Sequence, residues 1–288
     1  MNEDLICVLG PTASGKTKYA VNLALQIGGE IISADSRQVY RGMDIGTGKD
    51  LADYEVNGIR VPYHLIDIVE AGEKYNLFRY QKDFLRVYRD IRERGKMPIL
   101  CGGSGLYIEA VTKGYSFAEV PENIELRKDL EQMSMEELVR KLESMKSLHN
   151  KTDIDTKKRV IRAIEIEIYQ QDNPEMRILE GFPIVTRFIG MMISREERVR
   201  RIDQRLEERL RNGMIEEVKA LLDKGITPDD LIYYGLEYKY VTLYLTGYLE
   251  YVEMVEKLKV AIHQFAKRQM TWFRGMERRG VKIEWVKP

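Results

Sequence analysis

The chain has 288 residues, of which 44% are hydrophobic and 32% charged, with 46 basic and 46 acidic side chains. This composition excludes wholesale disorder, and the balanced charge excludes a uniformly basic nucleic-acid binder, so any basic surface must be local. Cys7 and Cys101 are the only cysteines and lie in apolar runs, which indicates neither a disulfide framework nor a zinc site. Because the cysteines indicate a reducing environment and no apolar run is long enough to cross a bilayer, we expect a cytoplasmic protein without membrane contact. We separately expect it to be a monomer.

The first third of the chain alternates short apolar runs with helical patterns. The expected strands are 5–9, 30–34, 61–68 and 97–101, and the expected helices are 17–27, 77–94 and 105–113. Strands that alternate with helices predict a parallel sheet with right-handed crossovers. The fold class we predict is α/β, a P-loop NTPase-like parallel sheet flanked by helices.

The pattern changes near residue 117, where the chain becomes charged and helical. Helices are expected at 122–132, 134–145 and 156–170, before a strand at 188–193 returns to the sheet. Two long helices, 195–224 and 251–279, and a short strand, 282–285, complete the chain. We therefore predict a core made of residues 1–116 and 186–288, with a small helical domain inserted at 117–185.

A phosphate-binding motif follows the first expected strand. It matches G-x-x-x-x-G-K-S/T in full, and its residues are Gly10, Pro11, Thr12, Ala13, Ser14, Gly15, Lys16 and Thr17. The glycines let backbone N–H groups turn toward an anion, Lys16 adds a point charge, and Thr17 offers a hydroxyl to Mg²⁺. The motif predicts a bound phosphate compound but not which compound it is or which bond breaks.

A polar cluster follows the second expected strand, at Asp35, Ser36, Arg37 and Gln38. Ligands of parallel α/β sheets bind at the carboxyl ends of strands, so Asp35 and Thr17 should face one crevice. Asp and Ser after a strand also commonly cap a helix, which is the structural alternative. The cluster is richer than a cap requires, and we favour a functional role.

Several segments together resemble the tRNA dimethylallyltransferases, also called tRNA isopentenyltransferases. They read GPTASGKT, ISADSRQVYRGMDIGTGK, YHLIDI, GGSGLYIEAV, KRVIRAIEI and AKRQMTWFR, and the resemblance runs from Leu5 to about Trp285. It implies transfer of the dimethylallyl group of dimethylallyl diphosphate to N6 of adenosine 37 in the tRNA anticodon loop. Diphosphate is released in that reaction.

The resemblance also implies catalytic roles for three residues. Asp35 would accept the proton of the attacking amine, because an ordinary Asp pKa of ~3.9 keeps the carboxylate ionised at neutral pH. Thr17 would hold Mg²⁺, the expected cofactor. Arg195 matches an arginine that reaches the diphosphate, although a solvated arginine at the end of a strand is the alternative.

Contacts with tRNA are implied for a larger set of residues. Those in the core are Asp35, Ser36, Arg37, Gln38 and Ser104, and those in the insertion are Arg127, Lys158, Arg159, Val160, Ile161 and Arg162. Lys157, Lys158 and Arg159 begin a helix that we expect Asp155 to cap, and cations there oppose the helix dipole. They favour an external phosphate, with an ordinary solvated surface as the alternative.

Two arginine-rich helical stripes occur after the insertion. Arg198, Arg201, Arg205 and Arg209 share one face of the first, and Lys267, Arg274 and Arg278 align on the second. We predict that Lys267 and Arg274 contact tRNA phosphates, with an ordinary solvated surface as the alternative for any single member of either stripe. The expected core stripe of the same last helix is Leu258, Ile262, Phe265 and Trp272.

One segment departs from the family pattern. Relatives usually carry Gly-Tyr-Lys/Arg-Glu/Gln, whereas this chain reads Tyr234-Gly-Leu-Glu-Tyr-Lys239. Three alternative functions are an adenylate isopentenyltransferase acting on free nucleotide, a P-loop small-molecule kinase, and a paralogue that binds tRNA without modifying it. Intact Lys16, Thr17 and Asp35 disfavour the last.

Overall fold

The computed structural model describes residues 3–114, 120–146, 154–173 and 184–288, and these ranges form two compact units. The first unit comprises residues 1–113 and 183–288, and the second comprises residues 114–182. We had placed the insertion at 117–185, so each border lies three residues earlier than we expected. Residues 115–119 and 174–183, which include one expected border, lie outside the described ranges.

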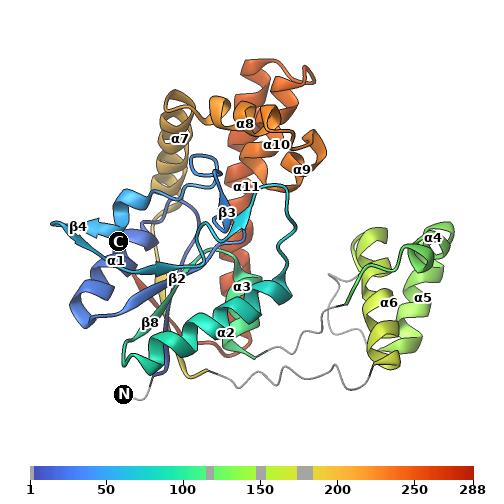
Figure 1. Cartoon of the computed structure of the whole chain (residues 1–288), viewed down its shortest axis with the longest axis horizontal. Helices are drawn as coiled ribbons and strands as arrows, with labels where there is room; N and C mark the ends of the chain where they lie inside the picture. The colour runs from blue at the N-terminus through green and yellow to red at the C-terminus, as the bar shows by residue number, and fades with distance from the viewer. Residues whose placement is uncertain (1–2, 115–119, 147–153, 174–183) are drawn as a thin grey trace. The chain divides into compact units, whose positions relative to one another are not determined.

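A six-stranded parallel sheet forms the centre of the first unit (Figure 1), as the alternating pattern predicted. Its order is β10 (Ile283–Val286), β9 (Thr186–Met191), β1 (Leu5–Leu9), β8 (Pro98–Gly102), β2 (Glu30–Ala34) and β6 (Tyr63–His64). Gly102 at the end of β8 lies opposite Leu9 on one side and Ala34 on the other. The carboxyl ends of β1, β8 and β2 are therefore level, which brings the loops that follow them together.

Side chains alternate between the two faces of the sheet, as the two-residue period of a strand requires. Leu5, Cys7 and Leu9 pack toward α2 (Leu77–Glu93) and α3 (Gly105–Thr112). Ile6 and Val8 pack toward α1 (Lys16–Ile27) on the opposite face. Both faces are thus covered by helices, which explains why the strands read as continuous apolar runs.

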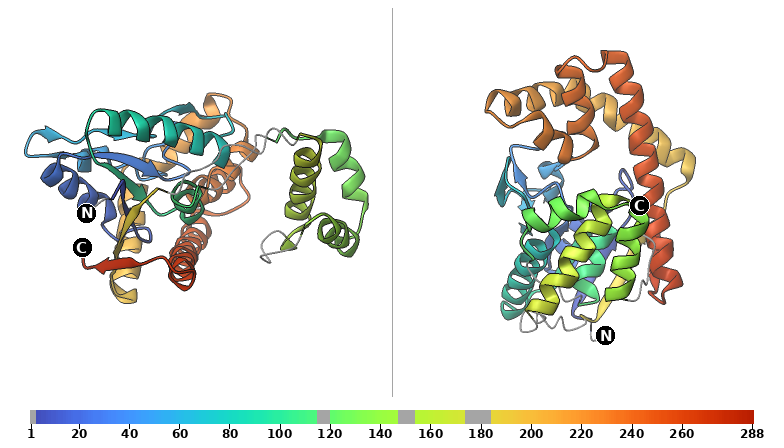
Figure 2. Two further views of the ribbon diagram at one scale, coloured as in Figure 1. Left: turned by 90° about the horizontal axis from the view of Figure 1, so that it is seen from below. Right: turned by 90° about the vertical axis from the view of Figure 1, so that its right-hand side faces the viewer.

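The C-terminal part of the first unit is helical, and α11 is its longest helix (red in Figure 2). The helices are α7 (Arg195–Arg211), α8 (Met214–Asp223), α9 (Pro228–Tyr233), α10 (Leu236–Leu245) and α11 (Tyr251–Arg278). We had predicted one helix over 195–224, but it divides at Gly213, whose φ of 99° is left-handed. In the described ranges, no helix combines the length and apolar character needed to cross a bilayer.

The expected strand over 61–68 is mostly wrong. Only Tyr63–His64 pairs with β2, and Val69–Glu70 forms a separate strand, β7, which pairs with β3 (Tyr40–Arg41). Leu65 and Asp67 have φ values of 61° and 55°, which a strand does not accommodate. In the chain between β3 and β6 lie a single 3₁₀ turn, η1 (Leu51–Tyr54), and a hairpin formed by β4 (Glu55–Val56) and β5 (Ile59–Arg60).

The second unit consists, where described, of α4 (Ile124–Gln132), α5 (Met135–Met145) and α6 (Lys157–Asp172). Leu130, Leu138, Leu142 and Ile164 are buried together in its own apolar core. Thr156, not Asp155 as we expected, caps α6, because its hydroxyl accepts a hydrogen bond from the Arg159 N–H. Asp155 instead pairs with the Arg159 guanidinium at 3.0 Å.

Candidate active site

The phosphate-binding loop joins β1 to α1. Ala13 and Gly15 adopt left-handed φ values of 60° and 82°, which turn the chain sharply before α1 begins at Lys16. Gly15 at the N-cap supplies no side-chain hydrogen bond, so the first turn of α1 presents its N–H groups and its positive dipole end to a ligand. Lys16 donates from Nζ to the Pro11 carbonyl at 3.3 Å, and this contact holds the ammonium over the loop.

Gln269 of α11 braces this loop against the neighbouring strand end. Its Oε1 accepts a hydrogen bond from the Thr12 N–H at 2.8 Å, and its Nε2 donates to the Gly103 carbonyl at 3.0 Å. A Cβ at Gly103 would lie 2.3 Å from that Nε2, so only glycine leaves room for the brace. Although the AKRQMTWFR segment carried part of the resemblance, we assigned no role to Gln269. The structure makes it the link between the loops after β1 and β8.

Asp35 and its neighbours follow β2 as predicted. The Oδ1 of Asp35 accepts from the Arg37 N–H at 2.8 Å, so the carboxylate stabilises its own turn as well as facing the cavity described below. Gln38 accepts from the Ser33 hydroxyl at 3.1 Å and donates to the Gly48 carbonyl at 3.1 Å. The Arg37 guanidinium lies 5.2 Å from the centroid of the Tyr233 ring.

A cavity of about 520 Å³ opens at the carboxyl edge of the sheet. Predicted site residues that line it are Thr12, Lys16, Thr17, Asp35, Ser36, Arg37, Gln38 and Ser104. The structure therefore brings the phosphate loop and the Asp35 carboxylate to one cavity, which is the arrangement that the sequence predicted. Other walls come from Gly46–Gly48, α7, α10 and α11.

The loop that contains Gly46 and Gly48 is fixed by Glu217 of α8, which sequence reasoning missed. The Glu217 carboxylate accepts hydrogen bonds from the N–H groups of Asp44, Ile45 and Gly46 at 2.7–3.0 Å. It also accepts from the Tyr238 hydroxyl at 2.6 Å. No local pattern indicates this role, because Glu217 lies more than 170 positions from the loop it holds.

The arginine predicted to reach the diphosphate, Arg195, lies apart from the cavity lining. Arg195 is exposed at the first turn of α7 and does not line the cavity. Arg205 and Arg209 of the same helix do line it, and Nη1 of Arg201 lies 3.8 Å from where a Cβ of Gly15 would be. These three arginines recur every fourth residue on one helical face and belong to the stripe that the sequence indicated.

The electrostatics of this edge favour an anion. Burial lowers the pKa of Lys16, and repulsion by Arg205 and Arg209 acts in the same direction, although Cys101 and Asp35 oppose it. A phosphate group placed against the loop would relieve that repulsion and satisfy the N–H groups of α1.

Part of the expected core stripe of α11 belongs to the cavity instead. Leu258 and Ile262 are buried as predicted, but Phe265 and Trp272 are 39% and 38% exposed and line the cavity. The Arg268 guanidinium lies 5.9 Å from the centroid of the Phe265 ring. Lys267 and Arg274 are exposed on α11 outside the cavity lining.

The predicted tRNA-contacting residues of the insertion serve different purposes in its structure. Val160 and Ile161 are buried in its apolar core, so their side chains are not available to tRNA and this prediction is corrected. Arg127 donates to Glu165 at 2.7 and 3.0 Å, and Arg162 pairs with the same carboxylate and donates to the Val120 carbonyl. Lys158 and Arg159 are exposed.

The residues that would hold Mg²⁺ are few. Among the described residues, no group of three or more His, Cys, Asp or Glu side chains is placed to bind a metal ion. Thr17 lines the cavity in the first turn of α1. One hydroxyl fits a magnesium ion that is held mainly by ligand phosphates and water, because Mg²⁺ commonly keeps such ligands in phosphate sites.

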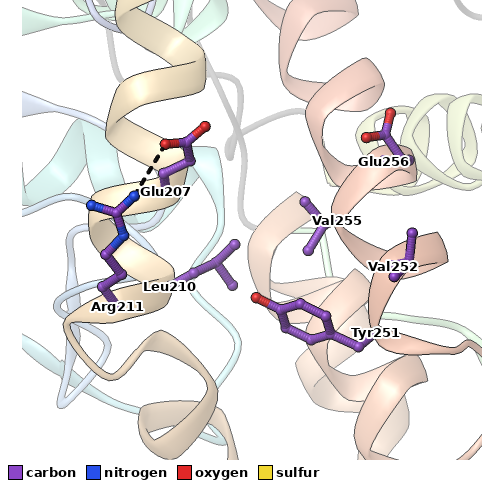
Figure 3. Close-up of a pocket in the computed structure, with 7 residues that line it drawn as sticks. All are labelled: Glu207, Leu210, Arg211, Tyr251, Val252, Val255 and Glu256. Atoms are coloured by element: carbon purple, nitrogen blue, oxygen red, sulfur yellow. Dashed lines mark hydrogen bonds and ion pairs between the residues drawn. The ribbon is translucent and has the colours of Figure 1, made fainter.

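A second, shallower depression of about 350 Å³ lies between α7 and the start of α11 (Figure 3). Leu210, Tyr251, Val252 and Val255 supply its apolar walls. Its charged members are Glu207, Glu256 and Arg211, with Arg211 and Glu207 paired at 3.4 Å. None of the motif residues named above lines it, and we place no chemistry there.

The sheet, the phosphate-binding motif and the cavity at the strand ends together define a P-loop-like α/β protein with a candidate active site at the carboxyl edge of the sheet. The IPP transferase family model matches residues 38–276. The tRNA dimethylallyltransferase 1 of Parabacteroides distasonis is 61% identical over 98% of this chain and 92% of its own length. The chain therefore belongs to the tRNA dimethylallyltransferase (IPP transferase) family.

Solved structures agree with this assignment. The tRNA isopentenylpyrophosphate transferase of Bacillus halodurans aligns with a TM-score of 0.72 and 34% identity, covering 99% of this chain and 90% of that one. A eukaryotic dimethylallyltransferase crystallised while acting on tRNA has the same fold, with a TM-score of 0.78 at 23% identity over 99% of this chain and 74% of that one. The relatives favour prenyl transfer to tRNA over the free-nucleotide and kinase alternatives.

Proposed function

We propose that this protein transfers the dimethylallyl group of dimethylallyl diphosphate to N6 of adenosine 37 in the tRNA anticodon loop. The observation that carries the proposal is that Lys16, Thr17 and Asp35 line one cavity at the carboxyl edge of the sheet. The reaction needs positive charge at its leaving group, which Lys16 would supply. It also needs a proton acceptor at its nucleophile, which the Asp35 carboxylate would supply.

The phosphate loop would act on the leaving group. As the allylic C–O bond breaks, its electron pair stays with the diphosphate, whose growing negative charge is stabilised by Lys16, the N–H groups of α1 and Arg201. Mg²⁺ bound at the Thr17 hydroxyl would neutralise further charge on the diphosphate oxygens. Gln269 would hold the loop close to the end of β8 through its hydrogen bonds to Thr12 and Gly103.

Asp35 would act on the nucleophile. The N6 amine forms the new C–N bond to the allylic carbon, and its proton passes to the Asp35 carboxylate. Ser36, Gln38 and Ser104 would surround the adenine. Because the target base must leave the anticodon loop to enter a cavity, the exposed rings of Phe265 and Trp272 would stack against bases at its mouth.

The wider tRNA interface would use the exposed cations Lys158, Arg159, Lys267 and Arg274, together with the half-buried Arg37. We drop Val160 and Ile161 from it, and Arg127 and Arg162 would shape the insertion through their shared partner, Glu165. We further propose that the protein acts as a cytoplasmic monomer, since tRNA and dimethylallyl diphosphate are its only partners in this scheme.

The test is incubation with labelled dimethylallyl diphosphate and either tRNA or AMP, with separate detection of phosphoryl transfer from ATP. Label should enter tRNA and diphosphate should be released in equal amounts. Label in AMP would establish the free-nucleotide activity instead, and phosphoryl transfer without use of the prenyl donor would establish a kinase.

A further inference from the structure

Arg209 occupies an unusual position for an arginine of a surface helix. Its side chain is only 14% exposed and lines the cavity beside Arg205. The guanidinium lies against Gly48, where a Cβ would be 1.8 Å from Nη2. Gly48, with a φ of 65°, therefore leaves the space that the guanidinium fills.

The partners of Arg209 satisfy little of its hydrogen-bonding capacity. In the part of the chain that the structure describes, Glu237 is the one carboxylate within ion-pair distance, with Oε1 3.4 Å from Nη1. A guanidinium carries five N–H donors, so a single long contact leaves donors for a ligand. Arg205, by contrast, makes a close ion pair with Asp50.

Burial makes this arrangement costly unless an anion joins it. Burial lowers the pKa of Arg209, and repulsion from Arg205 lowers it further. Burial also raises the pKa of Glu237, and Arg209 opposes that rise. A buried cation with one weak partner is better stabilised by a second anion than by its present surroundings.

Arg209 and Glu237 approach each other from two helices of the cavity wall. Arg209 belongs to α7 and Glu237 to α10, and both line the cavity. Their contact therefore joins a cation and a carboxylate within that wall.

We propose that Arg209 binds a phosphate oxygen of dimethylallyl diphosphate. Glu237 is a positioning residue, which holds the Arg209 guanidinium toward the cavity before the diphosphate binds. The inference rests on the proposed function and adds a residue to its diphosphate site. The diphosphate is favoured over an RNA phosphate because Arg209 is enclosed and lines the same cavity as Lys16 of the phosphate loop. An RNA backbone would pass over the exposed rim of the cavity.

The test compares Arg209→Gln with Arg211→Gln, a matched control on the same helix whose side chain is 75% exposed. Calorimetry measures binding of inorganic diphosphate with Mg²⁺, and filter binding measures tRNA affinity. Arg209→Gln should weaken diphosphate binding about tenfold or more, as expected for a charge-assisted contact, and raise KM for dimethylallyl diphosphate. Its tRNA affinity and that of the control should match the wild type.

Two further variants separate positioning from folding. Arg209→Lys keeps the positive charge but lacks the planar guanidinium and its paired N–H donors. This variant should lose part of the diphosphate affinity while remaining folded. Glu237→Gln should weaken diphosphate binding less than Arg209→Gln, and its effect should shrink in the Arg209→Gln background because both act through one contact.

Three results would overturn the inference. They are wild-type diphosphate affinity in both Arg209→Gln and Arg209→Lys, a loss confined to tRNA binding, and additive effects of the Arg209 and Glu237 changes. Failure of the proposed function would be separate, because wild-type protein would then transfer no label to tRNA whatever Arg209 does.

Discussion

Arginines of the core and arginines of the helical insertion were both predicted to meet substrate, yet the structure uses them differently. On α7, Arg205 and Arg209 turn into a cavity beside the phosphate loop. In the insertion, Arg127 and Arg162 converge on Glu165, whose side chain is 1% exposed. A matching motif thus identifies arginines that matter without saying whether they bind a ligand or stabilise the domain that does.

Among the changes that distinguish the core from the insertion, substitution of Asp35 should have the largest effect on prenyl transfer. Asp35→Ala should reduce prenyl transfer about 10²–10⁴-fold, because the amine loses its proton acceptor. Binding of tRNA, measured by filter retention, should stay near the wild-type value. Near-normal turnover in this variant would show that Asp35 is not the proton acceptor and would contradict the proposed mechanism.

In the insertion, Glu165→Ala should act on stability. Removing this carboxylate leaves Arg127 and Arg162 without their shared anion, and breaking a buried pair typically costs about 3–5 kcal/mol. Because Arg127 and Arg162 are partly exposed, we expect the lower end or less of that range. Thermal unfolding followed by circular dichroism should show an earlier transition, whereas Glu136→Ala on the exposed side of α5 should not.

The same carboxylate predicts a pH dependence. Burial disfavours ionised Glu165, but hydrogen bonds from Arg127, the Asn123 N–H and Arg162 outweigh burial and lower its pKa below 4.5. A carboxyl whose folded pKa is depressed stabilises the fold above its unfolded pKa and loses that contribution as pH falls through the folded value. Acid titration should therefore destabilise the wild type below about pH 4.5 more than Glu165→Gln. Parallel acid curves for the two proteins would contradict this assignment.

A smaller effect is expected when the brace between loops is removed. Gln269→Ala leaves the Thr12 N–H and the Gly103 carbonyl without their partner, a loss of about 1–3 kcal/mol for buried groups. The expected result is weaker diphosphate binding with an intact fold, measured by calorimetry and circular dichroism. Thr271→Ala is the control, since its hydroxyl donates within α11 to the Lys267 carbonyl.

The smallest effect should come from a single exposed cation of the insertion. Lys158→Ala should weaken tRNA binding and reduce the slope of log affinity against log salt by about 1. Lys158 is a better test of tRNA contact than Arg162, because a charge reversal at Arg162 would also break its ion pair with Glu165. Lys141→Ala on α5 should leave the slope unchanged, and an equal effect of both changes would indicate general charge attraction rather than a site.

How much of this molecule was predictable depends on the distance over which each contact acts. The P-loop, the strands β1, β2 and β8, and the position of Asp35 follow from motifs and periodicity within a few residues. The Asn57–Gly58 turn between β4 and β5 was also readable, since both residues adopt the positive φ that such tight hairpins need, but we did not use it. The division of 195–224 at Gly213 had a similar local signal.

The amino-acid sequence by itself determined the phosphate loop, the parallel α/β order and the family, because these depend on local backbone chemistry and strand alternation. Only the tertiary structure decided that Arg205 and Arg209 of the arginine stripe line a cavity together with Phe265 and Trp272, and that Gln269 and Glu217 hold its loops. The physical reason is that helical periodicity fixes which residues share a face, whereas the neighbour that this face meets is set by packing between segments far apart in the chain.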